Sequence, residues 1–209
     1  MRTPSLSALV DRAEVLLAGP GRVVIGIVGA PGAGKSTLAG QLLAALPADA
    51  VGHLPMDGFH LADVQLDRLG LRDRKGAPET FDVDGYVAAL RRLHEEPDRT
   101  MFAPGFERDL EQPIAAAIAI APSARLVVTE GNYLLLTGDG WERVRPLLTE
   151  AWFIEVDDDV RRERLVRRHE QFGKSPDAAR AWVDVVDEPN ARLVRATRSA
   201  ADVHISVVE

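Results

Sequence analysis

Apolar residues recur with two different spacings along this chain, and these spacings predict alternating strands and helices. Short β-branched or apolar runs, bounded by glycine, proline or polar residues, predict buried strands. Longer segments with apolar residues three or four positions apart predict helices with one buried face. We expect strands at residues 23–28, 50–56, 99–103, 126–129, 152–156 and 203–207, and helices at 3–17, 38–46, 61–69, 83–94, 141–148, 160–172, 176–186 and 189–200.

Single residues indicate where some of these elements begin and end. Thr3 followed by Pro4 starts the first helix, and Asp82 suits the N-cap position of the helix at 83–94. Pro104-Gly105 is expected to close the strand at 99–103, and the polar, basic residues 70–81 are expected to form a loop. Residues 106–124 fit either a helix or a strand that ends in a turn, and the strand is preferred.

The order of these elements predicts the fold class. Strands that alternate with helices favour crossover connections and a mostly parallel sheet, so an α/β fold is expected. A chain of 209 residues is long enough for one such unit. We interpret residues 1–209 as a single domain.

One glycine-rich loop carries the clearest chemistry. Residues 29–36 read GAPGAGKS and match G-x-x-x-x-G-K-[ST] between a strand and a helix, a register that a chance glycine turn would lack. Its backbone N–H groups would converge on a phosphate, Lys35 would reach the β- and γ-phosphates, and Ser36 would offer its hydroxyl to Mg²⁺. The predicted nucleotide-binding residues of the loop are Gly29, Ala30, Pro31, Gly32, Ala33, Gly34, Lys35, Ser36 and Thr37.

Two acidic residues end predicted strands at the edge of the sheet where ligands bind in open α/β folds. Asp57 could accept a proton from an attacking hydroxyl, or it could simply favour a turn before Gly58. Glu130 could hold Mg²⁺, directly or through water, or begin a turn before Gly131. The metal role is preferred for Glu130, and both alternatives stay open for Asp57.

Arginines crowd the helix predicted at 160–172. Arg161, Arg164 and Arg168 are spaced i, i+3 and i+7, so they share one helix face. Guanidinium groups on one face would suit the charge of a transferring phosphoryl group. The alternative is a solvated helix paired with the acidic residues 157–159.

Other basic residues near these motifs suggest a second substrate. Lys75 lies in the loop at 70–81 and Arg108 follows Phe106 in the segment APGFERD, although charged loops are also common on surfaces. His60 lies three residues after Asp57, and a lone histidine is more often a surface or core residue.

Composition excludes several classes of protein. The net charge of −7 argues against nucleic acid or an anionic membrane as the main partner, and the absence of cysteine excludes disulfides and zinc–thiolate sites. No segment has the roughly 20 apolar residues that span a bilayer, and the N-terminus does not resemble a signal peptide. We expect a cytoplasmic protein that binds neither nucleic acid nor a membrane.

These motifs together carry a family resemblance. The chain resembles the uridine kinase, pantothenate kinase and phosphoribulokinase group of P-loop kinases over nearly its whole length, and especially a bacterial branch labelled nucleoside kinase-like or fructokinase. GAPGAGKST is general to P-loop proteins, whereas MDGFH, KGAPETFD, APGFERD, TEGNYLL and VDDDVRRERLVRRH, in that order, are more specific. The resemblance implies a P-loop NTPase fold, a three-layer α/β/α structure with a mostly parallel sheet and a helical lid at about residues 161–175.

The same resemblance implies roles for individual residues. Asp57 falls at the catalytic aspartate, Glu130 at the acid of the second nucleotide motif, and Asp82 where uridine kinases contact ribose hydroxyls. Residues 106–108 fall in the acceptor-binding loop, which here lacks both the Tyr-Ser-His stretch of pantothenate kinases and the aromatic pattern of uridine kinases. The identity of the acceptor therefore does not carry over. The arginines that the resemblance places in the lid over ATP are Arg161, Arg164 and Arg168.

The predicted function is an ATP- and Mg²⁺-dependent kinase that acts on a hydroxyl of a small molecule, either a nucleoside, a sugar or a pantothenate-like alcohol. The predicted catalytic residues are Asp57, Lys35, Arg164 and Arg168, and the predicted acceptor-binding residues are Asp57, His60, Lys75, Asp82, Phe106 and Arg108. The alternative is a nucleotide-dependent switch or regulatory ATPase without an acceptor, although the N-K-x-D motif of GTPases is absent. The resemblance also allows a homodimer.

Overall fold

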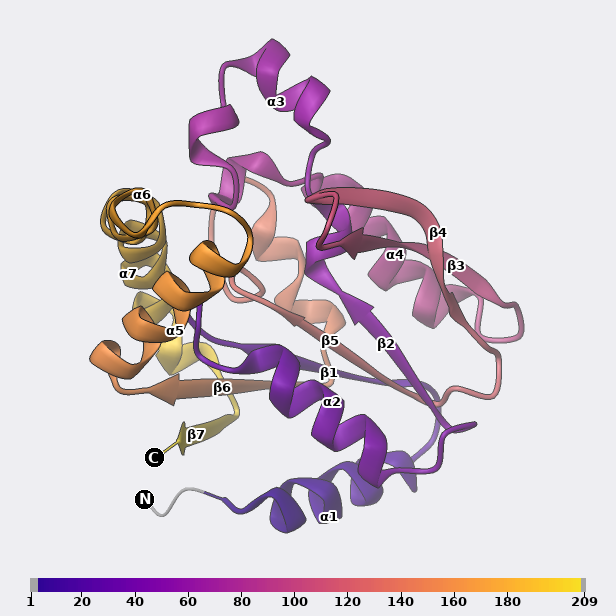
Figure 1. Ribbon diagram of the computed structural model, residues 1–209. Coiled ribbons are helices and arrows are strands. Elements are labelled where there is room, and N and C mark those ends of the chain that lie inside the picture. Colours follow the sequence, from indigo (N-terminus) through magenta and orange to yellow (C-terminus); the bar gives the residue numbers. More distant parts are fainter. Residues whose placement is uncertain (1–3, 208–209) are drawn as a thin grey trace.

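The computed structural model describes residues 4–207, which are built around one parallel sheet with helices on both faces (Figure 1). The sheet has the strand order β2-β5-β1-β6-β7, and each neighbouring pair of strands is parallel. Parallel neighbours need crossover connections, which explains why helices cover the sheet. The strands of the sheet are β1 (Val23–Val28), β2 (Val51–Pro55), β5 (Leu126–Gly131), β6 (Glu150–Val156) and β7 (Val203–Val207).

The apolar residues of the central strands are divided between two cores. In β1, Ile25 and Ile27 pack with helices α1 and α2, whereas Val24 and Val28 pack with α4 and α7 on the other face. Successive side chains of a strand point to opposite faces, so one β-branched run supplies both cores. This confirms the expected three-layer α/β/α arrangement. The helices are α1 (Leu6–Leu17), α2 (Lys35–Ala45), α3 (Asp63–Leu69), α4 (Val83–Glu95), α5 (Asp158–Gln171), α6 (Pro176–Trp182) and α7 (Glu188–Ala196).

Side-chain caps fix the start of several helices. Ser5 caps α1, and its hydroxyl accepts a hydrogen bond from the Ala8 N–H at 3.2 Å. Thr3, the expected start of this helix, lies outside the described residues. Asp82 caps α4, as predicted, by accepting the Gly85 N–H at 2.8 Å. No helix within residues 4–207 is long and apolar enough to cross a membrane.

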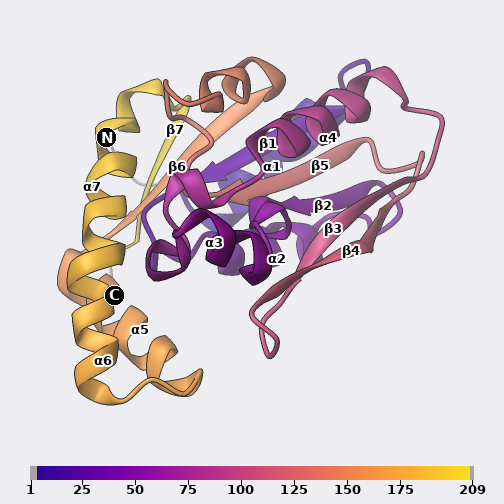
Figure 2. The ribbon, with the colours of Figure 1, turned by 90° about the horizontal axis from the view of Figure 1, so that it is seen from above.

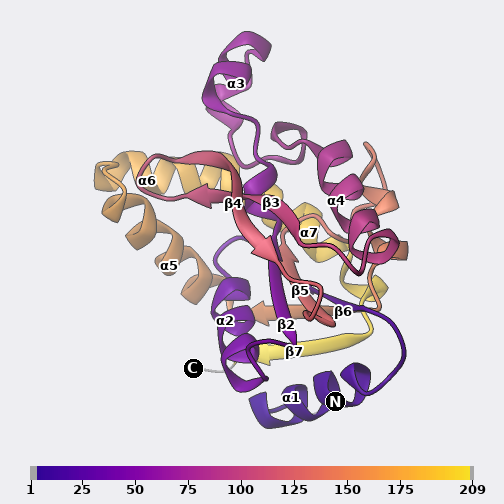
Figure 3. The same ribbon diagram turned by 90° about the vertical axis from the view of Figure 1, so that its right-hand side faces the viewer.

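A separate antiparallel hairpin, β3 (Met101–Glu107) and β4 (Gln112–Ile120), lies beside the main sheet (Figures 1 and 3). The strand preferred for part of residues 106–124 is confirmed. The prediction that Pro104-Gly105 closes the preceding strand is wrong, because a register irregularity between Ala103 and Gly105 lets β3 continue. A bulge of this kind accommodates a residue that cannot join the ladder.

Two other element predictions need correction. The helix expected at 141–148 is instead a pair of 3₁₀ turns, Trp141–Arg143 and Arg145–Leu147, because Pro146 lacks the N–H that a continuous α-helix needs there. The strand expected at 50–56 ends at Pro55, and Met56–Phe59 form a 3₁₀ turn that contains Asp57. The loop at 70–81 contains the short 3₁₀ turns Arg72–Arg74 and Pro78–Thr80.

Helices α5, α6 and α7 gather at one end of the molecule (Figure 2). The two helices expected at 176–186 and 189–200 are joined without a break, because a π-helical segment, Val183–Asp187, connects α6 to α7. Pro189 follows this segment and has no N–H to donate to the preceding turn, and the wide π turn accommodates that loss. Residues near the junction therefore take positions that a regular helix would not give them.

Candidate active site

The glycine-rich loop follows β1 and ends at the first turn of α2, as predicted. Gly32 and Gly34 have φ angles of +80° and +94°, in the region that favours glycine. A Cβ on Gly32 would lie 2.9 Å from the carbonyl oxygen of Arg161, so α5 packs directly over the loop. The open backbone and the N-terminus of α2 together present N–H donors of the kind that bind phosphate.

Lys35 lies at the centre of the site. Its Nζ donates to Asn132 Oδ1 at 2.7 Å and to the Ala30 carbonyl at 3.2 Å. Burial lowers the pKa of Lys35 to about 8, although the charges of Glu130 and Asp57 oppose the shift. A bound phosphate would place further negative charge next to this ammonium group and would favour its protonated form.

Ser36 and Glu130 form a hydroxyl–carboxylate pair beside the loop. The Ser36 hydroxyl donates to Glu130 Oε1 at 2.9 Å, and Glu130 is buried at the end of β5. Burial and the neighbouring charge of Asp57 raise the pKa of Glu130, against the effects of Lys35 and the Ser36 hydrogen bond. Oxygen ligands of this kind suit Mg²⁺.

Asp57 faces the same region from the 3₁₀ turn after β2. Its Oδ2 accepts a hydrogen bond from Arg108 Nη2 at 2.8 Å. Burial raises the pKa of Asp57, but its basic neighbours His60, Arg108, Lys35 and Arg168 outweigh burial and hold it below the ordinary value. Asp57 is therefore ionised at neutral pH and can accept a hydrogen bond from an alcohol.

His60 forms part of the site surface next to Asp57. Burial lowers the pKa of His60, so the ring is neutral at pH 7, and its Nδ1 lies 2.8 Å from the Asp57 carbonyl oxygen. That carbonyl can only accept, which assigns the proton to Nδ1 and leaves Nε2 as an acceptor. The ring packs against Phe81 and Phe106 at centroid distances of 4.0 and 4.8 Å.

Gly58 brings the hairpin to this surface. A Cβ at position 58 would lie 2.1 Å from the Pro104 carbonyl oxygen, so only glycine allows β3 to come this close. The contact holds the end of β3, and with it Phe106 and Arg108, next to Asp57.

Two cavities meet at the loop. One, of about 610 Å³, extends over Thr37 and Gln41 toward Ile205 and is lined by Arg164. The other, of about 570 Å³, is enclosed by the turn with Asp57, the hairpin and the α5–α6 region. Both cavities are lined by Gly32, Lys35, Ser36 and Arg168. We call the first the P-loop cavity and the second, which is lined by residues predicted to bind an acceptor, the acceptor cavity.

The three arginines predicted on one face of α5 separate in the structure. Arg168 lines both cavities, and Arg164 Nη1 lies 3.7 Å from the Cβ position of Gly34. Arg161 is buried and does not line either cavity. Its side chain supports the loop from behind, where Nη1 donates to the Pro31 carbonyl at 3.2 Å.

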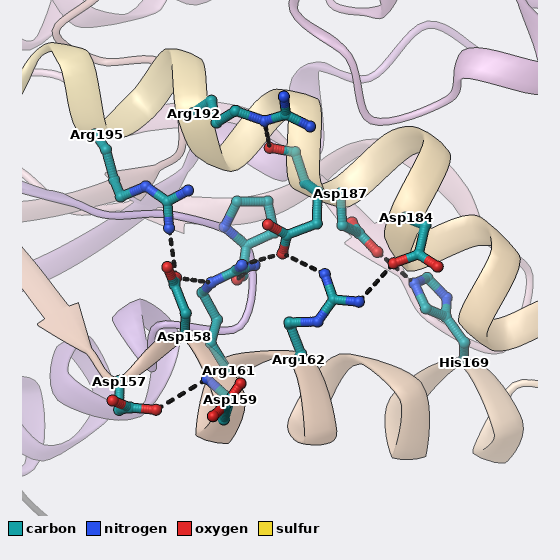
Figure 4. A network of polar contacts seen from close by, with 12 residues as sticks. Asp157, Asp158, Asp159, Arg161, Arg162, His169, Asp184, Asp187, Arg192 and Arg195 are labelled. Atoms are coloured by element: carbon teal, nitrogen blue, oxygen red, sulfur yellow. Dashed lines mark hydrogen bonds and ion pairs between the residues drawn. The ribbon is translucent and has the colours of Figure 1, made fainter.

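Arg161 belongs to a network of ion pairs that joins α5 to α7 (Figure 4). Its Nε donates to Asp158 at 3.1 Å and its Nη2 contacts Glu188. Arg195 of α7 also contacts Asp158, and Arg162 contacts Glu188. The network therefore couples the glycine-rich loop to both helices.

Of the other residues predicted to bind an acceptor, all but Asp82 line the acceptor cavity. Lys75, His60, Phe106 and Arg108 all line the acceptor cavity. Asp82 does not line it, because its side chain caps α4, and its contact with an acceptor stays a prediction.

Sequence reasoning missed several residues of the site. Asn132 binds Lys35, and its place just after Glu130-Gly131 was the available signal. His169 Nε2 lies 2.8 Å from Asp187 Oδ2, and both side chains line the acceptor cavity with Trp182. No local pattern connects them, because Asp187 lies in the π-helical segment.

The parallel sheet, the glycine-rich loop and its part-buried lysine define a nucleotide-binding protein of the P-loop kinase class. The chain belongs to the phosphoribulokinase / uridine kinase family, whose model matches residues 24–209. Kinases of this family carry out ATP-dependent phosphorylation of small molecules, so the predicted resemblance is confirmed at the level of the family.

Individual relatives agree with this assignment. A protein of Schizosaccharomyces pombe named as a candidate uridine kinase is 36% identical over 173 residues, which cover 79% of this chain and 74% of that protein. The YggC protein of Escherichia coli K12 is 35% identical over 194 residues, covering 90% and 79%. The crystal structure of a candidate fructose transport system kinase from Silicibacter sp. TM1040 has a TM-score of 0.87 and 37% identity, covering 96% and 98% of the two chains.

Proposed function

We propose that this protein is an ATP- and Mg²⁺-dependent kinase that transfers the γ-phosphate to a hydroxyl of a small molecule. One observation carries the proposal: Lys35, Ser36, Asp57 and Glu130 line a single cavity, and that cavity joins the P-loop cavity at the loop. A phosphate donor and an alcohol bound in the two cavities would meet at this junction. A cavity of about 570 Å³ is within the size range of small-molecule sites.

The proposed roles follow from the chemistry of each side chain. Lys35 and the loop N–H groups hold the donor phosphates, and Arg168, which lines both cavities, neutralises charge on the group in transfer. Asp57 accepts the proton of the acceptor hydroxyl, whose oxygen bonds to the γ-phosphorus as the bond to the departing ADP oxygen breaks. Most of the rate then comes from positioning and electrostatics.

Ser36 and Glu130 fit a magnesium ion. They offer a hydroxyl and a carboxylate 2.9 Å apart beside the phosphate loop. Within the described residues no three or more His, Cys, Asp or Glu side chains form a metal cluster, and Mg²⁺ at kinase sites needs only one or two protein carboxylates besides phosphates and water. When bound, the ion would neutralise phosphate charge during transfer.

We also propose that residues 161–175 act as a lid. Arg164 and Arg168 come from this segment, and Lys174 at its end lines the acceptor cavity. Closure over both cavities would exclude water and so limit hydrolysis of the donor.

Asp57→Asn tests the proposed base. The variant should bind ATP normally and lose phosphate transfer by about 10²–10⁴-fold, because the amide cannot accept the proton. Asp84→Asn is the matched control, since Asp84 is exposed and forms an ion pair with Arg143 away from both cavities. Nucleotide titration and ADP release with a panel of nucleosides, sugars and vitamin alcohols would measure the two effects. Near-normal transfer by Asp57→Asn would exclude Asp57 from the mechanism.

The same assay separates a kinase from a nucleotide switch. A kinase of this design should release ADP rapidly only when an alcohol is present, since the acceptor cavity must be filled for transfer. Rapid phosphate release without any acceptor would support a regulatory ATPase instead.

A further inference from the structure

The acceptor cavity contains basic residues that a nucleotide does not need. Arg72, Lys75, Arg108 and Lys174 line the acceptor cavity and do not line the P-loop cavity. They come from three separate segments: the loop after α3, the hairpin, and the end of the lid. Basic side chains that converge from different elements indicate a ligand between them.

Lys75 and Arg108 flank one aromatic ring. The Lys75 ammonium lies 5.6 Å and the Arg108 guanidinium 5.5 Å from the centroid of Phe106. Both charges contribute to the lowered pKa of His60, so their positive potential reaches the site surface beside Asp57. Lys75 is held in place by Asp63 at 2.7 Å and by the Glu111 carbonyl oxygen.

Arg108 and Lys174 keep donors available for a ligand. Arg108 uses Nη2 to bind Asp57, which leaves other N–H donors of its planar guanidinium group without a described partner. Lys174 makes no ion pair within residues 4–207, and its ammonium lies 4.3 Å from the centroid of Trp182. Among the carboxylates that line this cavity, Asp57 is engaged by Arg108 and Asp187 by His169, and the lining also contains Asp73 and Glu111.

We propose that the acceptor is an anion: a hydroxy compound whose carboxylate or phosphate group is bound by Arg108 and Lys174, with Lys75 adding positive charge beside Phe106. This inference rests on the proposed kinase function and narrows its substrate class. Arg108 would then do two things, orienting Asp57 and binding the far end of the acceptor. Lys174 would link acceptor binding to closure of the lid.

Binding of inorganic phosphate tests the anion site without knowledge of the acceptor. The full chain is first saturated with a nonhydrolysable ATP analogue and Mg²⁺, which fills the phosphate loop, and phosphate is then titrated by calorimetry. Arg108→Gln and Lys174→Gln should each weaken phosphate binding by about 10–100-fold, the range expected for one hydrogen bond to a charged group. Arg167→Gln is the matched lid control and should bind phosphate like the wild type, because Arg167 is exposed and pairs with Glu163.

A second measurement compares acceptors that share a carbon skeleton. Three-, five- and six-carbon polyols are each assayed as the neutral alcohol, the carboxylate and the monophosphate, with uridine as a neutral nucleoside. The charged members should exceed the neutral one by at least about tenfold in kcat/KM. Comparing the kcat/KM of the carboxylate with that of the monophosphate identifies the anion. Lys174→Gln should raise the acceptor KM while the ATP KM and kcat change little.

The outcomes separate the inference from the proposed function. Phosphate that fails to bind, or that binds the Arg108 and Lys174 variants like the wild type, overturns the anion site. Equal or better use of neutral alcohols also overturns it and leaves the kinase intact. Phosphate binding that depends on both residues, without transfer to any alcohol, supports the anion site and refutes the kinase.

Discussion

Replacing Gly58 with alanine tests whether the hairpin must touch the turn that carries Asp57. The added Cβ would lie 2.1 Å from the Pro104 carbonyl oxygen and 2.7 Å from its carbonyl carbon. Carbon–oxygen contacts in proteins are ordinarily no closer than about 3.3 Å. These neighbours are backbone atoms that no side-chain rotation can move, so the hairpin must shift by about 1 Å.

The size of the effect follows from that shift. Overpacking a close contact costs about 1–3 kcal/mol, and a backbone clash belongs at the upper end. For a chain of this length each kcal/mol lowers the melting temperature by about 2–4 °C, so Gly58→Ala should melt roughly 6–12 °C lower. Because a 1 Å misplacement can cost about 10²-fold in rate, the acceptor kcat/KM should fall by about that factor. ATP binding should not change, since the loop lies on other elements.

Gly40→Ala is the matched control for this substitution. Gly40 lies on the exposed side of α2, and nothing lies within 4 Å of its Cβ position. Alanine there should raise the free energy of unfolding by about 0.5–1 kcal/mol. Thermal denaturation, ATP titration and acceptor kinetics would be measured for both variants. A Gly58→Ala protein with wild-type stability and acceptor kinetics would show that the close approach of the hairpin is not needed.

Three further predictions concern the loop and its supports. Arg161→Gln should lower the free energy of unfolding in urea by about 1.5–3 kcal/mol, because it removes a buried guanidinium group that bonds to Pro31, Asp158 and Glu188. The half-exposed Arg162→Gln should cost about 1 kcal/mol or less, and equal losses would contradict a special role of Arg161. Desolvation lowers the pKa of the part-buried Lys35 to about 8 in the folded protein, below its value in the unfolded chain. Between about pH 8 and 10.5 the unfolded state therefore binds more protons, so the stability of the wild type relative to Lys35→Met should rise by about 3 kcal/mol over this range. A constant difference in stability would argue against desolvation of this charge. Glu130→Gln should raise the Mg²⁺ concentration for half-maximal transfer by about tenfold or more, and an unchanged Mg²⁺ requirement would remove Glu130 from the metal site.

Local patterns were sufficient to predict the phosphate loop and the acids beside it. Glycines, a lysine and a serine at fixed spacing between a strand and a helix specify the loop geometry within a short stretch of chain. Asp57 and Glu130 could be placed near it because parallel strands end at one edge of the sheet. Both predictions depended on local periodicity and one topological rule.

The placements that could not be predicted depend on how a helix is rotated against its neighbours and on where its turns widen. Arg161, Arg164 and Arg168 share a helix face in sequence, yet packing of α5 against the loop buries Arg161 and leaves the other two at the cavities. The pair of His169 and Asp187 links α5 to a π-helical segment that joins two helices which the pattern separated. Such placements are set by tertiary contacts that residue spacing does not encode.

Within residues 4–207, the hairpin of β3 and β4 forms its own ladder and pairs with no strand of the main sheet. Under the proposed function, substitutions in this hairpin at positions other than Arg108, which binds Asp57, would change the acceptor cavity and leave the phosphate loop between β1 and α2 unchanged. Variants with altered acceptor selectivity should therefore be sought in this hairpin first, because it can change without altering the strands and the helix that hold the phosphate loop.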